Sequence, residues 1–385
     1  MTDAAMKTES TPFATPRYVI DERALRRNLE ILKDVSERSG AKILLAQKAF
    51  SCAATYPICA RHLAGTTASS LFEARHGHDN FGGETHVFAP AFVPGEMDEL
   101  LSLVDHIVFN SPRQVALFGD AARARGVSVG LRVNPEVSVA TTPAYDPCRP
   151  TSRLGTRRAD LDAAGAPRLD GLHFHCLCDQ GVDELRKVLA GFEERFGDML
   201  PSMKWVNFGG GHHITRADYD VDGLVELVAG FRARHPHLTV YLEPGEAIAL
   251  NAGTLESRVL EIQPKGEDGV ANAILDTSAA CHMPDVIEMP YTPRVTGARI
   301  GAEGPYAYRF GGPTCLAGDE IGTYSFDRPL SEGDMVVFED MAIYSMVKNN
   351  TFNGLNLPSI AIRREDGSVE TLRTFGYADF AVRLA

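Results

Sequence analysis

Lys42–Gln47 (KILLAQ) is the first of eight short apolar runs that have the composition of β-strands. The other seven are Gly65–Ser69, His86–Pro90, His106–Asn110, Val127–Val133, Gly171–Cys176, Trp205–Gly210 and Thr239–Pro244. Amphipathic stretches of helical period precede or separate the runs, such as Asp21–Ser39 and Ala217–Arg234. Alternating strands and helices indicate parallel strands joined by right-handed crossovers.

The eight units span residues 42 to 244, about 25 residues each, which predicts a (β/α)8 TIM-like barrel. An open doubly wound sheet is the alternative. The barrel is favoured because unusual polar residues and glycines stand at or just after the C-terminal ends of different runs, where such barrels hold their active sites. These residues are Lys48, Arg132, His173, His175, Gly209, Gly210, Gly211 and Glu243.

The composition of the sequence and its pattern of apolar residues change after about residue 250. Proline and glycine recur every few residues, and alternating runs such as Ala271–Asp276 follow one another without long helices. We therefore expect an α/β plus all-β chain, with a barrel over residues 18–250 and a β domain over residues 251–385. Residues 1–17 could pair with the β domain rather than with the barrel, because Arg17–Ile20 (RYVI) has strand character.

Charge and cysteine content narrow the range of partners. The 38 basic and 51 acidic residues give a net charge of −13, which repels nucleic acid and suits a cationic small molecule. Seven cysteines are too few for a disulfide framework in 385 residues and favour a reducing compartment. Met1–Pro16 lacks the pattern of a signal peptide, and no run of 18 apolar residues occurs. We expect a cytoplasmic protein without a nucleic-acid or membrane partner.

Two of the residues at the strand ends suit the binding of an aromatic aldehyde. Apolar neighbours of Lys48 would lower the pKa of its amine and make it a nucleophile for a Schiff base, although a lysine that only extends to solvent is the alternative. Glu243 precedes Pro244-Gly245, and this turn would fix its carboxylate at the barrel mouth. A carboxylate fixed there could keep a pyridine nitrogen protonated.

The histidines and glycines allow two interpretations each. His173 and His175 occupy alternate strand positions and would point the same way, either as a metal pair joined by His212-His213 or as a flat plate against a cofactor ring. We expect no metal, because no acidic residue stands beside them at a spacing typical of a metal site. The glycines 209–211 could bring backbone N–H groups to a phosphate or form a plain tight turn. Together with Lys48 and Glu243, these groups fit pyridoxal 5'-phosphate.

The motifs resemble those of the alanine racemase-like, fold-type III pyridoxal-phosphate decarboxylases. The resemblance covers nearly the whole chain and rests on LAQKAFS around Lys48, NFGGGH at 207–212, EPGEA at 243–247, CHMPD at 281–285, GGPTCLAGD at 311–319 and DMAIYSMVKNNTFNG at 340–354. Within that group, CHMPD and the last segment are similar to carboxynorspermidine/carboxyspermidine decarboxylases. The resemblance implies a lyase that makes norspermidine or spermidine in polyamine biosynthesis.

The resemblance also implies roles for individual residues. Lys48 would bind the cofactor covalently, His175 would stack on its ring, and Glu243 would pair with the pyridine nitrogen. The glycines 209–211 and Tyr377 would hold the phosphate. In a homodimer with shared active sites, Cys315 and Asp319 would reach the partner's substrate, with Cys315 or a water as the acid that returns a proton.

Two positions depart from the wider group. Glu246 stands where ornithine- and diaminopimelate-type enzymes place a phosphate-binding Arg, and Cys178 stands where they usually have Ser. We expect Glu246 and Asp285 to bind the ammonium groups of a carboxylated polyamine. The alternatives are a diaminopimelate or ornithine/lysine decarboxylase of the same fold, and a zinc-dependent TIM-barrel hydrolase that uses His173, His175 and His212.

Overall fold

The computed structural model describes residues 15–165 and 167–385 and divides the chain into two compact units. The barrel unit is Arg23–Leu250, and the sheet unit combines Asn251–Ala385 with the described part of Met1–Glu22. The barrel unit begins at residue 23, five residues after the expected start at residue 18. Most of Met1–Pro16, the segment expected to carry no signal peptide, lies outside the described residues.

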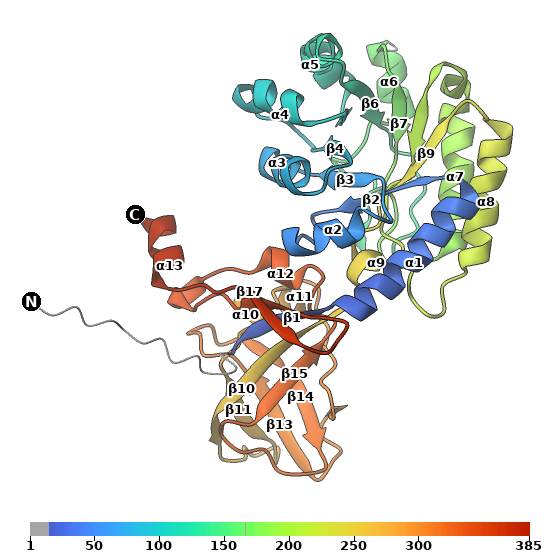
Figure 1. Cartoon of the computed structure of the whole chain (residues 1–385). Helices are drawn as coiled ribbons and strands as arrows, with labels where there is room; N and C mark the ends of the chain where they lie inside the picture. Colours follow the sequence, from blue (N-terminus) through green and yellow to red (C-terminus); the bar gives the residue numbers. More distant parts are fainter. Residues whose placement is uncertain (1–14, 166) are drawn as a thin grey trace, which may run out of the picture. The chain divides into compact units, whose positions relative to one another are not determined.

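Eight parallel strands of the described barrel unit close into a barrel in chain order, with the last pairing back to the first (Figure 1). They are β2 Lys42–Ala46, β3 Gly65–Ala68, β4 Glu84–Phe88, β5 His106–Phe109, β6 Ser128–Arg132, β7 Gly171–His173, β8 Trp205–Asn207 and β9 Thr239–Leu242. Each strand overlaps one of the eight apolar runs. The expected (β/α)8 barrel is confirmed, and the open doubly wound sheet is excluded.

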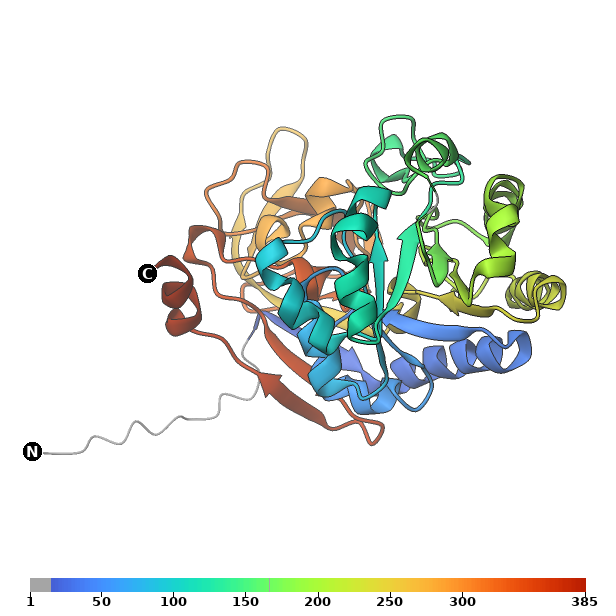
Figure 2. The same ribbon diagram turned by 90° about the horizontal axis from the view of Figure 1, so that it is seen from above.

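The longer helices of this unit lie outside the barrel strands (Figures 1 and 2). The helices are α1 Glu22–Ser39, α2 Tyr56–Cys59, α3 Leu71–Asn80, α4 Met97–Leu103, α5 Pro112–Ala124, α6 Arg158–Ala164, α7 Val182–Phe196, α8 Val221–Arg234 and α9 Glu246–Ala249. Helix α8 begins later than the periodicity from residue 217 indicated, because Asp220 caps it by accepting the Gly223 N–H at 2.9 Å. Among the described residues, no helix has both the length and the apolar character needed to cross a membrane.

One aromatic side chain fills part of the barrel interior. The indole of Trp205 lies so close to two glycines that an added Cβ would come within 2.3 Å of it at Gly130 and 2.1 Å at Gly171. Its Nε1–H donates to the Ser128 hydroxyl at 2.8 Å, so its polar edge is satisfied. Around it pack Leu44, Val108 and Tyr241.

In the described part of the sheet unit, nine strands form one mixed sheet in the order β12-β14-β13-β11-β10-β1-β16-β17, with β15 also paired to β10. The strands are β1 Arg17–Asp21, β10 Gly253–Gln263, β11 Ala271–Leu275, β12 Arg299–Ile300, β13 Tyr306–Gly311, β14 Glu320–Phe326, β15 Met335–Glu339, β16 Ser359–Arg363 and β17 Val369–Arg373. The short helices are α10 Ala279–His282, α11 Asp285–Glu288, α12 Ser345–Lys348 and α13 Tyr377–Leu384.

Strand β1 connects the start of the chain to this sheet. It pairs antiparallel with β10 and parallel with β16, so segments more than 200 residues apart in sequence lie side by side (Figure 1). The buried Arg17 guanidinium lies 2.6 Å from Glu256 on β10, which helps to fix the register. Residues 1–14, the rest of the segment for which pairing with the β domain was considered, lie outside the described residues.

Candidate active site

The loops after β2, β7, β8 and β9 hold one another at the C-terminal end of the barrel. The carbonyl of Pro244 accepts the Ala46 N–H at 3.1 Å, which joins the loop after β9 to the end of β2. The Glu243 N–H donates to the Gly209 carbonyl at 2.7 Å, and this bond joins the loops after β9 and β8. The strand order thus brings Lys48, His175, the glycines and Glu243 to one mouth, as the sequence predicted.

Glu243 is a buried, ionised carboxylate. One oxygen accepts the Asn207 side-chain N–H at 2.7 Å, and the other lies 3.2 Å from Nε2 of His173. Burial alone would raise the pKa of Glu243, but His173 and Asn207 lower it to about 2. A fixed negative charge of this kind suits a protonated pyridine nitrogen.

His173 supports that carboxylate from β7. Burial lowers the pKa of His173 even though Glu243 acts to raise it, so the imidazole is neutral and donates its Nε2–H to Glu243. Its ring stacks on Phe88, with centroids 5.6 Å apart. His173 thereby holds the Glu243 carboxylate in place.

His175 presents a neutral aromatic ring. The Gly210 N–H donates to its Nδ1 at 3.1 Å, so that nitrogen carries no proton. Burial, followed by the nearby Lys48 charge, holds the pKa of His175 well below its ordinary value. The carbonyl of His175 accepts a hydrogen bond from buried Arg132 at 2.8 Å, which fixes the backbone beneath the ring.

The positions of the histidines test the interpretation of this region as a metal site. A ring nitrogen of His173, one of His175 and an oxygen of Glu243 lie within 4.8 Å of one another, so the two histidines do point the same way. Within the described ranges, His212 is not part of this group, and its Nδ1 instead lies 2.7 Å from the Tyr219 hydroxyl. The zinc set of His173, His175 and His212 is therefore not brought together.

Lys48 lies in the turn directly after β2. Solvent reaches its side chain, yet protein atoms surround the ammonium group, and this desolvation lowers its pKa. The charge of Arg132 lowers the pKa further, whereas the charges of Glu243 and Glu246 oppose the shift. An accessible amine that gives up its proton more easily is suited to attack an aldehyde.

The three glycines after β8 are required by close packing. A Cβ on Gly210 would lie 2.0 Å from the Glu243 carbonyl oxygen, and one on Gly211 would lie 1.9 Å from the Leu177 carbonyl oxygen. Gly209 and Gly211 also have positive φ values of 70° and 85°. No other residue type fits all three positions.

Two of the three glycine amides are already used inside the protein. The Gly209 N–H donates to the Asn207 side-chain oxygen at 2.8 Å, and the Gly210 N–H donates to His175. In the part of the chain that the structure describes, the Gly211 N–H has no hydrogen-bond acceptor. The amine, neutral ring, ionised carboxylate and free amide together fit pyridoxal phosphate, but the glycines offer few donors for its phosphate.

A second charged group lies in the same loops. Nε2 of His213 lies 3.0 Å from Asp179 Oδ1 and hydrogen-bonds Glu246 Oε2. Burial alone would lower the pKa of His213, but the two carboxylates raise it to about 9. Sequence reasoning missed Asp179 and considered His213 only as a zinc ligand; its position two residues after Gly211 was the available signal.

The expected residues of the sheet unit differ in exposure. Cys315 is exposed, and its N–H donates to the Asn353 side chain at 2.8 Å. Asp319 is buried and accepts hydrogen bonds from the Ser278 hydroxyl at 2.8 Å, the Thr314 hydroxyl at 2.7 Å and the Ala280 N–H at 3.1 Å. Asp319 thus anchors the loop that carries Cys315.

The other two expected residues lie near the ends of short helices. Asp285 opens α11 and pairs with the ammonium group of Lys348, which also contacts Glu288. Burial lowers the pKa of Lys348, but these two carboxylates raise it above its ordinary value. Tyr377 opens α13 and is exposed.

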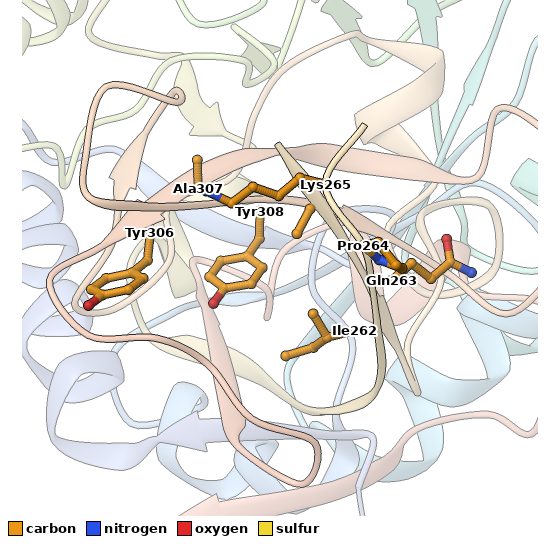
Figure 3. Close-up of a pocket in the computed structure, with 8 residues that line it drawn as sticks. Ile262, Gln263, Pro264, Lys265, Tyr306, Ala307 and Tyr308 are labelled. Carbon is orange, nitrogen blue, oxygen red and sulfur yellow. The ribbon is translucent and has the colours of Figure 1, made fainter. Parts of the chain in front are cut away.

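The sheet unit also contains a surface hollow of about 330 Å³ beside β13 (Figure 3). Tyr306 and Tyr308 line it from the same face of that strand, and Ile262 and Lys265 also line it. None of the residues expected from the sequence lines this hollow.

Comparison with known proteins identifies the family of the chain. A family model described as pyridoxal-dependent decarboxylase, C-terminal sheet domain, matches residues 17–342. The carboxynorspermidine/carboxyspermidine decarboxylase of Campylobacter jejuni is 43% identical over 380 residues, covering 96% of this chain and 98% of that enzyme. The carboxyaminopropylagmatine decarboxylase of Synechocystis is 42% identical over 370 residues, covering 96% of this chain and 95% of that enzyme.

A solved structure gives the same result. The crystal structure of carboxynorspermidine decarboxylase from Campylobacter jejuni, complexed with norspermidine, matches with a TM-score of 0.89 and 42% identity, covering 96% of this chain and all of that one. The resemblance seen in the motifs is confirmed, and a zinc-dependent hydrolase is excluded by the family match. This chain belongs to the pyridoxal-dependent decarboxylases.

Proposed function

We propose that this chain decarboxylates carboxynorspermidine, carboxyspermidine or both, releasing CO₂ with norspermidine or spermidine. The observation that carries this assignment is 43% identity along 98% of the Campylobacter jejuni enzyme named for these substrates. The relative solved with norspermidine supports the same substrate class. A net charge of −13 also suits a polycationic substrate.

The barrel unit would hold the cofactor. Lys48 would bind pyridoxal phosphate covalently, His175 would lie against its ring, and the Gly211 N–H would donate to its phosphate, with Tyr377 as a further contact. When bound, the cofactor supplies a ring that accepts the electrons left by the departing carboxylate. Glu243 would increase that capacity by keeping the pyridine nitrogen protonated, since its own pKa of about 2 keeps it charged.

Cys315 would return the proton to the carbon that has lost its carboxylate. Its thiol is exposed in the described chain, and the surrounding loop is anchored by the hydrogen bonds to Asp319. We assign Asp319 the positioning of this loop, because its oxygens already accept hydrogen bonds from the protein. Cys315 would act in the site of a partner chain in a homodimer, as in the expectation from the motifs.

Glu246 and Asp285 would bind the ammonium groups of the substrate. Asp285 already binds a primary ammonium, that of Lys348, which supports its capacity to bind the end of a polyamine. His213 balances only one of the two carboxylates that face it, and Lys348 likewise balances only one of Asp285 and Glu288, so each group keeps one negative charge. These charges would repel the carboxylate that the far end of diaminopimelate carries. The charge of the site thus favours a polyamine over the diaminopimelate alternative.

Carboxyaminopropylagmatine is a second candidate substrate. The Synechocystis enzyme named for it is 42% identical over nearly the same share of this chain as the Campylobacter jejuni enzyme. The far end of carboxyaminopropylagmatine is a guanidinium, which a carboxylate also binds well. Charge alone therefore does not separate the two candidates, and the choice needs a direct comparison.

The test is CO₂ release by the purified holoenzyme from carboxynorspermidine, carboxyspermidine, carboxyaminopropylagmatine, diaminopimelate and ornithine. We expect the highest kcat/KM for one of the first two, which differ from each other by one methylene and hence by about 1–3 kcal/mol in transition-state binding. A preference for carboxyaminopropylagmatine would transfer the assignment to the second candidate. Turnover of diaminopimelate or ornithine alone would overturn both.

A further inference from the structure

The group formed by Asp179, His213 and Glu246 has no role in the reaction described above beyond the substrate contact suggested for Glu246. Asp179 and His213 come from the loops after β7 and β8, and Glu246 is the first residue of α9, the short helix that follows β9. Both carboxylates face the same nitrogen of His213, Nε2. Within the described residues, the other ring nitrogen, Nδ1, has no hydrogen-bond partner.

These contacts fix both the protonation and the direction of the ring. Two carboxylates on Nε2 stabilise the doubly protonated imidazolium, in which Nδ1 also carries a proton. Nδ1–H is therefore a charged donor that the surrounding protein leaves unused. The Asp179 N–H donates to the Gly211 carbonyl at 2.7 Å, which ties the group to the glycine segment.

The glycine segment needs such a donor. The amides of Gly209 and Gly210 are bonded to Asn207 and His175, so the segment offers an anion only the Gly211 N–H. Without a cation nearby, the charges of Asp179 and Glu246 would repel a phosphate placed beside Gly211. One imidazolium between them halves that negative charge and supplies a donor.

We propose that His213 is a cofactor-binding residue whose imidazolium, held by Asp179 and Glu246, donates Nδ1–H to the phosphate of pyridoxal phosphate beside Gly211. The role rests on the cofactor of the family and requires no particular substrate. It gives Glu246 a function that precedes substrate binding, namely holding His213 charged. His213 is not needed to bind the aldehyde or the ring.

Other titratable groups around the ring do not supply this charge. His212 is neutral near pH 7, because burial lowers its pKa to about 4. Arg216 is directed to Asp218, at 2.5 Å. Cys178 carries no charge, since burial raises its pKa to about 11. Lys48 is close enough for the charge of Glu246 to raise its pKa, but its amine is the group proposed to bind the aldehyde of the cofactor.

The experiment measures binding to the full-length apoenzyme, without any substrate, of pyridoxal phosphate and of pyridoxal, which lacks the phosphate. His213→Gln should weaken pyridoxal phosphate by about 10- to 100-fold, the cost of one charge-assisted hydrogen bond, and leave pyridoxal unchanged. Glu246→Gln should act in the same direction. His213→Lys should restore part of the affinity because it keeps a positive charge, and exposed His78→Gln is the matched control.

The pH dependence provides a second readout. Wild-type affinity for pyridoxal phosphate should fall as the pH rises through about 9, where His213 loses its proton. The fall should move to lower pH in Glu246→Gln, because one of the two stabilising carboxylates is gone. The affinity for pyridoxal should not show this difference between the two proteins.

Three results would overturn the role of His213. In the first, His213→Gln binds pyridoxal phosphate as tightly as wild type does. In the second, it loses both ligands equally, which would indicate a structural role. In the third, treatment of the wild type with a chelator weakens pyridoxal phosphate as much as His213→Gln does, which would assign the charge to a cation held by Asp179, His213 and Glu246. None of these results bears on the choice of substrate.

Discussion

Two glutamates in neighbouring positions are held in different ways. Glu243 accepts hydrogen bonds from neutral partners, Asn207 and His173, and keeps its whole negative charge. Glu246 faces the imidazolium of His213, so that much of its charge is balanced within the protein. At the scale of single residues, the protein thus keeps the charge of Glu243, which we propose for the cofactor ring, and balances much of the charge of Glu246.

The protonation of His213 should also contribute to stability. Its folded pKa of about 9 lies above the unfolded value of about 6.5, so its contribution is complete below pH 6.5 and is lost as the pH rises through 9. The difference in free energy of unfolding between wild-type apoprotein and His213→Gln should therefore shrink between pH 6.5 and about 9. Urea unfolding at a series of pH values measures it. A difference that grows with pH would contradict this protonation.

At the scale of elements, β6, β7 and β8 meet through one indole. Gly171→Ala would place a Cβ within 2.1 Å of Trp205, and we expect it to destabilise the barrel unit by about 1–3 kcal/mol through overpacking. Trp205 is the only tryptophan of the chain, so its fluorescence during urea unfolding reports this unit directly. Gly95→Ala is the control, because nothing lies within 4 Å of the added Cβ. Equal stability of the two variants would show that the barrel interior can accommodate the added methyl group without cost.

The elements themselves were largely predictable. Eight apolar runs at regular spacing led to eight barrel strands. Buried parallel strands need continuous apolar side chains, and the alternation of strand and helix recurs at regular intervals along the barrel unit. The start of α8 was placed too early, because helical periodicity extends over residues that Asp220 excludes by capping. Periodicity identifies the buried face of a helix and does not identify its first hydrogen bond.

The contacts between loops were not predictable. The sequence indicated Lys48, His175 and Glu243, since each stands one or two residues after the end of a strand. That Gly210 donates to His175, and that Asp179 meets His213, depends on loops far apart in sequence whose paths no local pattern specifies. The same applies to Asp319, whose hydrogen bonds come from residues 278, 280 and 314.

At the scale of the whole molecule, the proposed sharing of active sites has a direct consequence. If Lys48 of one chain works with Cys315 of another, inactive Lys48→Ala and Cys315→Ala dimers should regain activity when their chains exchange. Random exchange gives about a quarter of the wild-type activity, because half the dimers are mixed and each has one intact site. CO₂ release after mixing measures this. Activity that stays at the level of the separate variants would mean that each chain completes its own site.

The chain as a whole belongs to the pyridoxal-dependent decarboxylases, and we propose that its chemistry depends on the amine of Lys48. The most direct test compares wild type with Lys48→Ala, saturated with pyridoxal phosphate, for CO₂ release from carboxynorspermidine and carboxyspermidine. We predict that the variant loses both the visible absorption of the lysine-bound cofactor and all but a trace of the CO₂ release, while its urea unfolding stays close to that of wild type. Full decarboxylation by Lys48→Ala would contradict the account.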